Sequence, residues 1–386
     1  MENREFFNAF PVGYYQFHPD VSLNFQMNRV YNFVHDEVTL NDLRIVAPRI
    51  RDYSDMQREF LALAERERTS SSSSKLRQAF YLRAAEFFMF ADDPEKQATR
   101  KRFKQLLIEL NPLAEERKYE VPYEEISLPA YRFTPEHAKG TIVLFGGFDS
   151  YAEEYFGMLS LLYKLGYDAI VFEGPGQGSV LEDLHMPMTP EWEKPVKAVL
   201  DFFQLDDVTL LGISLGGELV IRAAAFEPRV QRAIADDVMS DHLDVVLRQF
   251  DSEVRPLLEQ AFEQGSVQQV NALLEREMRT SLVVEWVIKH GMHVMGAATP
   301  YEFFQKSSSY RTADFSSDVT QDVLILAAAE DHYVPLHQFT DQISTLTNVR
   351  SLTARLFTRQ EQAQNHCQAG NLGLSLRVMI NWIESL

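Results

Sequence analysis

Cysteine is almost absent from this chain of 386 residues, in which Cys367 is the single one. One cysteine cannot form a disulfide within the chain, so nothing in the sequence points to an oxidising compartment. Long apolar runs are missing too. No stretch approaches the roughly 18 apolar residues of a membrane helix, and the N-terminal MENREFFNAF has no basic flank before an apolar run. We therefore expect a cytoplasmic protein without a membrane partner.

Basic residues are scarce relative to acidic ones. The 37 Lys and Arg residues stand against 56 Asp and Glu residues, which gives a formal net charge of -19. Because such a surface repels phosphate backbones and anionic lipids, the sequence argues against a nucleic-acid partner. The composition is otherwise that of a folded globular protein, with 45% hydrophobic residues. It leaves the oligomeric state open, a homodimer included.

The N-terminal third of the chain has the pattern of helices. Apolar residues recur at spacings of three and four around residues 56–63 and 76–87, and a serine-rich turn separates the two runs. From about Tyr119, short alternating runs with Pro and Gly predict a hairpin of two strands. We therefore expect a helical N-terminal domain over residues 1–118.

A rhythm of strands and helices begins after the hairpin. Continuous apolar runs that end in Gly or Asp predict strands buried on both faces, and the segments between them have helical periodicity. This pattern predicts an α/β fold with a mostly parallel, doubly wound sheet over residues 119–238 and 318–386. Residues 239–317 interrupt the rhythm and predict a helical lid insertion. The expected strands are 141–145, 168–172, 208–211, 232–235, 323–327 and 351–357.

The segment GISLGG at residues 212–217 lies between an apolar strand and a helical segment. This is the context that a nucleophile elbow requires. Gly212 and Gly216 suit a sharp, strained turn from which the side chain of Ser214 projects. The sequence therefore makes Ser214 the candidate nucleophile.

A serine nucleophile needs a histidine base and a carboxylate that orients the histidine, and at such an elbow these follow in the order acid, then histidine. Asp331 comes just after the strand 323–327, and we expect it to be the acid, with Glu330 as its nearest rival. His366 follows the last strand and precedes the last amphipathic helix, so it is the expected base.

Two further histidines, His332 and His337, lie close to the acid in the sequence. They sit in or just after its loop rather than beyond the next strand, which makes them weaker candidates for the base. Together with the neighbouring carboxylates they do not show the H-E-x-x-H spacing that places two imidazoles on one helix face. We therefore expect no metal and no cofactor.

Hydrolysis through a tetrahedral intermediate also needs backbone N–H groups aimed at the developing oxyanion. One is expected from Leu215, the residue after the nucleophile. The other is expected from the loop GGFDS at residues 146–150, where Phe148 is the candidate.

Other residues are candidates for contact with a small-molecule substrate. Asp149 either orients the loop after the first parallel strand or contacts substrate, and Asp237 stands at the end of another strand. Tyr14 and Trp286 lie in the two segments expected to cover the sheet, where plain core packing is the alternative role. His290 in the insertion contacts substrate or faces solvent.

The motifs together resemble those of the α/β-hydrolase superfamily. More narrowly, the chain is similar to the branch that holds 2,6-dihydropseudooxynicotine hydrolase, the fungal polyketide-shortening hydrolases and the fermentation-respiration switch protein. The resemblance implies a helical domain ahead of the hydrolase core and cleavage of esters or of carbon–carbon bonds beside a ketone. Phe145 departs from the commonest pattern, which has a histidine before the Gly-Gly pair. The motifs that carry the resemblance are GGFDS (146–150), EGPGQG (173–178), GISLGG (212–217), EDHYVP (330–335) and NH (365–366).

We therefore expect a serine hydrolase that cleaves an ester or a ketone carbon–carbon bond of an apolar or aromatic small molecule through Ser214, His366 and Asp331. Two alternatives remain from the sequence alone. One is an acyltransferase that uses the same triad with water excluded, and the other is a ligand-binding relative that has lost the chemistry.

Overall fold

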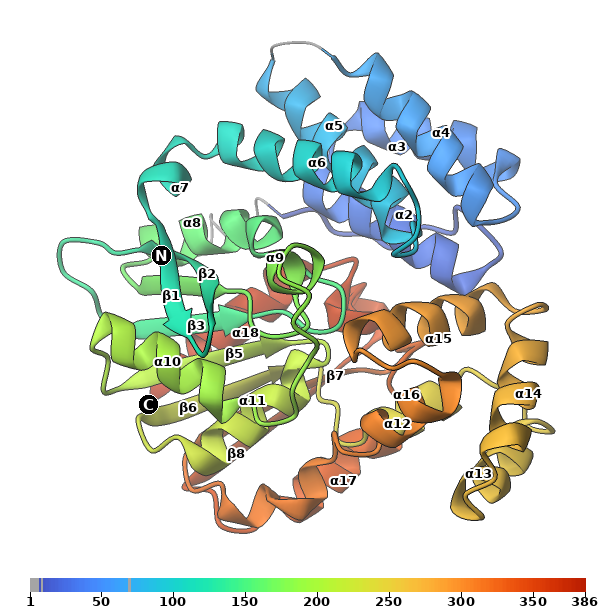
Figure 1. Ribbon diagram of the computed structural model, residues 1–386. Coiled ribbons are helices and arrows are strands. Elements are labelled where there is room, and N and C mark those ends of the chain that lie inside the picture. Colours follow the sequence, from blue (N-terminus) through green and yellow to red (C-terminus); the bar gives the residue numbers. More distant parts are fainter. Residues whose placement is uncertain (1–6, 8–9, 69–70) are drawn as a thin grey trace. The chain divides into compact units, whose positions relative to one another are not determined.

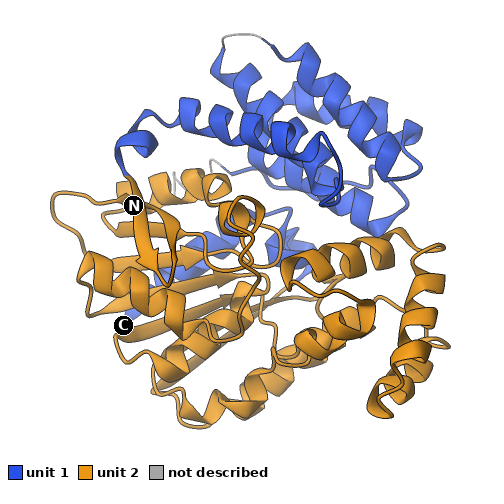
Figure 2. Ribbon diagram, viewed as in Figure 1, with its two compact units in different colours: residues 1–117, 358–386 blue, residues 118–357 orange. Residues whose placement is uncertain are grey.

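The computed structural model describes residues 7, 10–68 and 71–386, and the chain divides into two compact units (Figure 2). The first unit comprises residues 1–117 and 358–386, and the second comprises residues 118–357. In the part of the chain that the structure describes, no helix has both the length and the apolar character needed to cross a membrane.

The second unit is built around one sheet of eight strands in the order β1-β2-β4-β3-β5-β6-β7-β8 (Figure 1). β1 and β2 form the expected antiparallel hairpin, β2 is antiparallel to β4, and all other neighbours are parallel. The predicted α/β fold with a mostly parallel sheet is confirmed. The strands are β1 Lys118–Tyr123, β2 Ile126–Phe133, β3 Thr141–Phe145, β4 Asp168–Phe172, β5 Val208–Ile213, β6 Val230–Asp236, β7 Asp322–Ala328 and β8 Ser351–Phe357.

The direction of the chain reverses at the centre of the sheet. It moves outward from β3 to β4 and then returns past β3 to β5. Because such crossovers are right-handed, this reversal places α8 and α10 on opposite faces, and α11 packs beside α10. The loops that leave β3 and β5 therefore diverge at the carboxyl edge, where open α/β sheets bind ligands. The connecting elements are η2 Ala152–Tyr155, α8 Phe156–Lys164, α9 Gly178–Glu182, α10 Glu193–Phe203 and α11 Gly216–Phe226.

A run of helices interrupts the sheet between β6 and β7, as the sequence predicts. In this run α14 packs against α13, α15 and α16, and α15 also packs against α16. The function of this insertion as a lid stays a prediction. The elements are α12 His242–Leu247, α13 Arg255–Glu263, α14 Val267–Glu277, α15 Leu282–Val294, α16 Pro300–Ser307, η3 Thr312–Asp314 and η4 Ser316–Asp318, and α17 His337–Thr345 follows between β7 and β8.

The first unit is helical. Among the described residues, five helices of this unit are preceded by a residue whose side chain accepts a hydrogen bond from a backbone N–H of the first turn: Asp20, Asp36, Asp52, Ser71 and Asn371. α5 is buried along most of its length because it packs against α2, α4 and α6. The elements are α2 Val21–Val34, α3 Glu37–Val46, η1 Ala47–Arg49, α4 Tyr53–Arg66, α5 Ser72–Phe87, α6 Lys96–Leu110, α7 Pro112–Glu116, η5 Arg359–Glu361, η6 His366–Gln368 and α18 Leu372–Ser385.

The segment after β8 packs within this first unit. The backbone N–H of Gly370 donates to Asn32 Oδ1 of α2 at 2.8 Å, and the carbonyl of Gly370 accepts from the N–H of Gly13 at 2.7 Å. The division into an N-terminal domain, a core and a lid at residues 118, 238 and 317 remains a prediction about the chain's domains.

Candidate active site

The turn between β5 and α11 has the geometry of a nucleophile elbow. Ser214 adopts φ 62°, in the left-handed region that non-glycine residues rarely occupy. Its N–H donates to the carbonyl of Asp236 at 2.7 Å, and its own carbonyl accepts from the N–H of Gly217 at 2.7 Å. These two bonds hold the strained residue at the carboxyl end of β5, and its side chain is only partly buried.

Glycine is required where the backbone segments around this elbow approach one another. A Cβ on Gly212 would overlap the carbonyl of Gly216. A Cβ on Gly147 would stand 2.6 Å from the backbone nitrogen of Leu215 and 2.9 Å from the carbonyl oxygen of Ile213. The loop after β3 therefore lies directly against the residue that follows Ser214.

The two expected oxyanion donors are the backbone N–H groups of Phe148 and Leu215. Among the residues that the structure describes, neither the N–H of Phe148 nor that of Leu215 donates to a protein acceptor. Phe148 follows β3 by three residues, and Leu215 precedes the first turn of α11. Free N–H groups on two adjoining backbone segments are what an oxyanion site needs.

Asp331 is held after the end of β7. Its side chain is 4% exposed, and its Oδ1 accepts from the N–H groups of Tyr333 at 2.7 Å and Val334 at 3.0 Å. The rival Glu330 is exposed.

Asp237, at the end of β6, is buried and lines a void of about 10 Å³ together with Asp331. That volume is close to the smallest that holds one water molecule.

His366 lies in η6 of the first unit. Its ring is buried and meets the ring of Phe25 from α2 edge-on, with 6.0 Å between the centroids. The backbone after it is sharply turned, since Cys367 and Gln368 both adopt φ 49°. His366 is thus fixed by its own unit, and its pairing with Asp331 belongs to the proposal below.

The other histidines near the acid have different surroundings. His337 in α17 is exposed, and its Nε2 lies 3.2 Å from a carboxylate oxygen of Asp244. The ring of His332 lies against that of Tyr333, with 3.9 Å between the centroids.

Aromatic side chains gather around Phe148. Its ring lies 5.2 Å from that of His242 and 5.2 Å from that of His290, and the ring of Trp286 is 6.2 Å away. Trp286 also lies 6.4 Å from the ring of Tyr333, in the loop of the acid. The insertion thus supplies aromatic contacts to the loops after β3 and β7.

His242 opens α12 and was not singled out from the sequence. Burial lowers its pKa to about 3, so the imidazole is neutral at physiological pH. The one available signal was its position just after β6, at the carboxyl edge of the sheet.

Tyr14 belongs to the first unit. Its backbone N–H donates to Gln362 Oε1 at 3.3 Å, and burial raises the pKa of its phenol to about 12 against a smaller lowering by Asn24. Its expected contact with substrate stays a prediction, as does that of Asp149.

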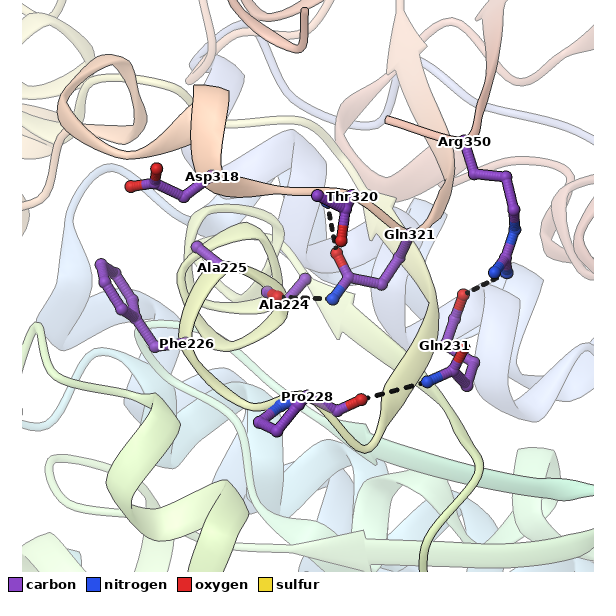
Figure 3. Close-up of a pocket in the computed structure, with 9 residues that line it drawn as sticks. All are labelled: Ala224, Ala225, Phe226, Pro228, Gln231, Asp318, Thr320, Gln321 and Arg350. Atoms are coloured by element: carbon purple, nitrogen blue, oxygen red, sulfur yellow. Dashed lines mark hydrogen bonds between the residues drawn. The ribbon is translucent and has the colours of Figure 1, made fainter. Parts of the chain in front are cut away.

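A separate cavity of about 220 Å³ opens at the amino ends of β6, β7 and β8 (Figure 3). Its polar side chains bond to neighbouring protein atoms: Gln321 Nε2 donates to the carbonyl of Ala224 at 2.8 Å, and the guanidinium of Arg350 donates to Asp322. Because Ser214 and Asp331 stand at the carboxyl ends of their strands, this cavity lies at the opposite edge from them.

Comparison with known proteins supplies named relatives. No family model matches the chain. The hydrolyase poxO of Penicillium oxalicum is 31% identical over 304 residues, which cover 71% of this chain and 71% of the relative. The hydrolase acrC of Aspergillus aculeatus is 28% identical over 316 residues, which cover 73% of each chain.

Solved structures share the fold. The crystal structure of 2,6-dihydroxy-pseudo-oxynicotine hydrolase matches with a TM-score of 0.65 and 24% identity, over 88% of this chain and 90% of that one. AbyA5 matches with a TM-score of 0.68 and 16% identity, over 93% of this chain and 94% of that one. The similarity extends over both units of the chain.

Proposed function

The chain belongs to the α/β-hydrolase family and is a hydrolase, and from this premise we propose that Ser214 is its nucleophile, with His366 as base and Asp331 as the acid that orients it. The observation that carries the proposal is the strained elbow at Ser214 beside the N–H groups of Leu215 and Phe148, which donate to no acceptor among the described residues.

The proposed reaction proceeds in two halves. Ser214 Oγ attacks a carbonyl carbon while His366 takes the hydroxyl proton, and the N–H groups of Phe148 and Leu215 bind the oxyanion of the tetrahedral intermediate. His366 then gives the proton to the leaving group as its bond to the acyl carbon breaks. Water, deprotonated by His366, releases the acyl group from Ser214.

The proposed substrate is an apolar or aromatic small molecule. The aromatic rings of Phe148, Trp286 and Tyr333 lie around the loops that carry the oxyanion donor and the acid, which supports this class. The bond is an ester or a carbon–carbon bond beside a ketone. A ketone's leaving group is carbanion-like and must be protonated, and the buried Asp237 is proposed to relay to it the proton that His366 has taken from Ser214.

The test is labelling by an aryl-tagged fluorophosphonate together with turnover of aryl esters. Ser214→Ala should abolish labelling and reduce turnover by about 10⁴-fold or more, because truncation of a triad nucleophile removes the covalent path. Ser309→Ala, at an exposed serine of the insertion, is the matched control and should label normally. Labelling of Ser214→Ala at the wild-type rate would show that the nucleophile lies elsewhere.

A further inference from the structure

The loop that carries Phe148 is held by a side chain from the loop after β4. Gln177 is 3% exposed, and its Nε2 donates to the carbonyl of Gly146 at 2.7 Å and to that of Gly147 at 3.2 Å. Its Oε1 accepts from the N–H of Gly174 at 3.1 Å, which fixes the orientation of the amide. The amide nitrogen of Gln177 thus donates and its amide oxygen accepts, so both groups of the side chain are hydrogen-bonded.

The carbonyl of Gly147 and the N–H of Phe148 belong to one peptide group. In a planar trans peptide the two point in opposite directions. A hydrogen bond from Gln177 to the carbonyl thus turns the N–H of Phe148 away from Gln177. Gly147 has no side chain to restrict its rotation, so Gln177 supplies a restraint that the backbone lacks.

A second side chain holds the next carbonyl. His290 Nε2 lies 3.0 Å from the carbonyl oxygen of Phe148, and because a carbonyl can only accept, Nε2 carries the proton. The imidazole stacks on Trp286 one turn earlier in α15, with 4.9 Å between centroids and 16° between planes. Every carbonyl from Gly146 to Phe148 thereby accepts a hydrogen bond, while the N–H of Phe148 donates to no acceptor in the described part of the chain.

We propose that Gln177 and His290 are positioning residues that together fix the N–H of Phe148 as an oxyanion donor. The proposal rests on the proposed function of Ser214 and goes beyond it, because it makes the oxyanion site depend on α15 of the insertion. Neither side chain acts on the substrate itself: each acts through the backbone of the loop.

The test measures the second-order rate at which a fluorophosphonate labels Ser214, since the phosphonyl oxygen uses the same N–H donors in the transition state. Gln177→Met keeps the length of the side chain and removes the donor, and it should slow labelling by about 100-fold. His290→Phe keeps the stacked ring and should slow it by about tenfold. His290→Gln places an amide nitrogen near the position of Nε2 and should stay within about threefold of wild type.

A histidine on the same helix provides the control. His293 Nε2 lies 3.2 Å from Glu182 Oε1, so it is engaged with α9 rather than with the loop of Phe148. His293→Phe should label at the wild-type rate. With an aryl ester, the slowed variants should lose kcat while KM changes little, because the oxyanion exists only after attack.

The proposal is overturned if Gln177→Met and His290→Phe are labelled at the wild-type rate. It is also overturned if His290→Gln is labelled as slowly as His290→Phe, because the effect would then come from packing of the ring. Should Gln177→Met fail to fold, Gln177→Asn, which withdraws the amide by one methylene, and the His290 pair decide the outcome. Failure of the wild type itself to label at Ser214 would instead refute the proposed function.

Discussion

The free energy of unfolding of the hydrolase core should fall as the pH rises, and Glu218 is the residue responsible. It lies on α11, one turn after Ser214, and its side chain is fully buried. Neither carboxylate oxygen has a hydrogen-bond partner among the described residues. Burial raises the pKa of Glu218 to about 8, opposed by the charge of Arg222 and reinforced by that of Glu193. The carboxyl group is therefore mostly protonated at neutral pH.

The size of the effect follows from the two pKa values. The unfolded chain ionises this group at its ordinary pKa of 4.5, whereas the folded chain keeps the proton up to about 8. Between these values unfolding releases a proton, so the free energy of unfolding falls by about 1.4 kcal/mol per pH unit. The full loss is about 5 kcal/mol. This loss of stability is absent at a pH below the pKa of Glu218 in the unfolded chain and complete at a pH above its pKa in the folded chain.

Urea unfolding of Glu218→Gln and its parent at several pH values between about 5 and 8 measures this slope. A Trp382→Phe background leaves Trp192 and Trp286 as fluorescent reporters, and both belong to the second unit, as Glu218 does. The difference in free energy of unfolding between parent and variant should change by about 1.4 kcal/mol per pH unit, in favour of the variant as pH rises. A Glu263→Gln control, at an exposed residue of α13, should show no such slope. A difference that is constant with pH would refute the reasoning.

Three further predictions concern the reaction. Asp331→Asn should reduce kcat by about 10³- to 10⁴-fold, while Glu330→Gln, at the surface, should have little effect, and the reverse ranking would reassign the acid. Gly147→Ala should reduce kcat by about 100-fold, because its Cβ would stand 2.6 Å from the backbone nitrogen of Leu215 and would force the oxyanion loop to shift. Asp237→Asn should slow cleavage of aryl ketones more than that of aryl esters, and equal effects on both would remove the support for carbon–carbon cleavage.

Much of the sheet could be predicted because its strands are buried on both faces. The strands at 141–145, 168–172 and 351–357 have the predicted bounds. β5 extends the predicted run by two residues at one end, and β6 and β7 extend theirs by one or two residues at each end. The nucleophile elbow could also be predicted from the sequence, since it needs only a strand, a turn of small residues and a helix in succession. The left-handed φ of Ser214 confirms the strained turn that its flanking glycines predicted.

The restraints on the oxyanion loop could not be predicted in the same way. Gln177 was visible within the motif EGPGQG, but nothing local shows which carbonyl its amide meets, because that depends on how β3 and β4 align. His290 lies 142 residues from the carbonyl that it contacts. The sequence left its role open between substrate contact and exposure to solvent. Only tertiary packing decides such long-range pairs.

The elbow, which could be predicted, and the restraints on the oxyanion loop, which could not, are connected by the close approach of two backbone segments at Gly147. The loop after β3 must pass Leu215 so closely that no Cβ fits, which forces glycine into the position just before the donor Phe148. Glycine removes the steric restraint that would otherwise fix the peptide. An oxyanion donor must nevertheless be preorganised, because its contribution depends on paying no reorganisation cost during the reaction. Side chains from outside the loop are therefore needed to hold its carbonyls, and Gln177 and His290 occupy those positions.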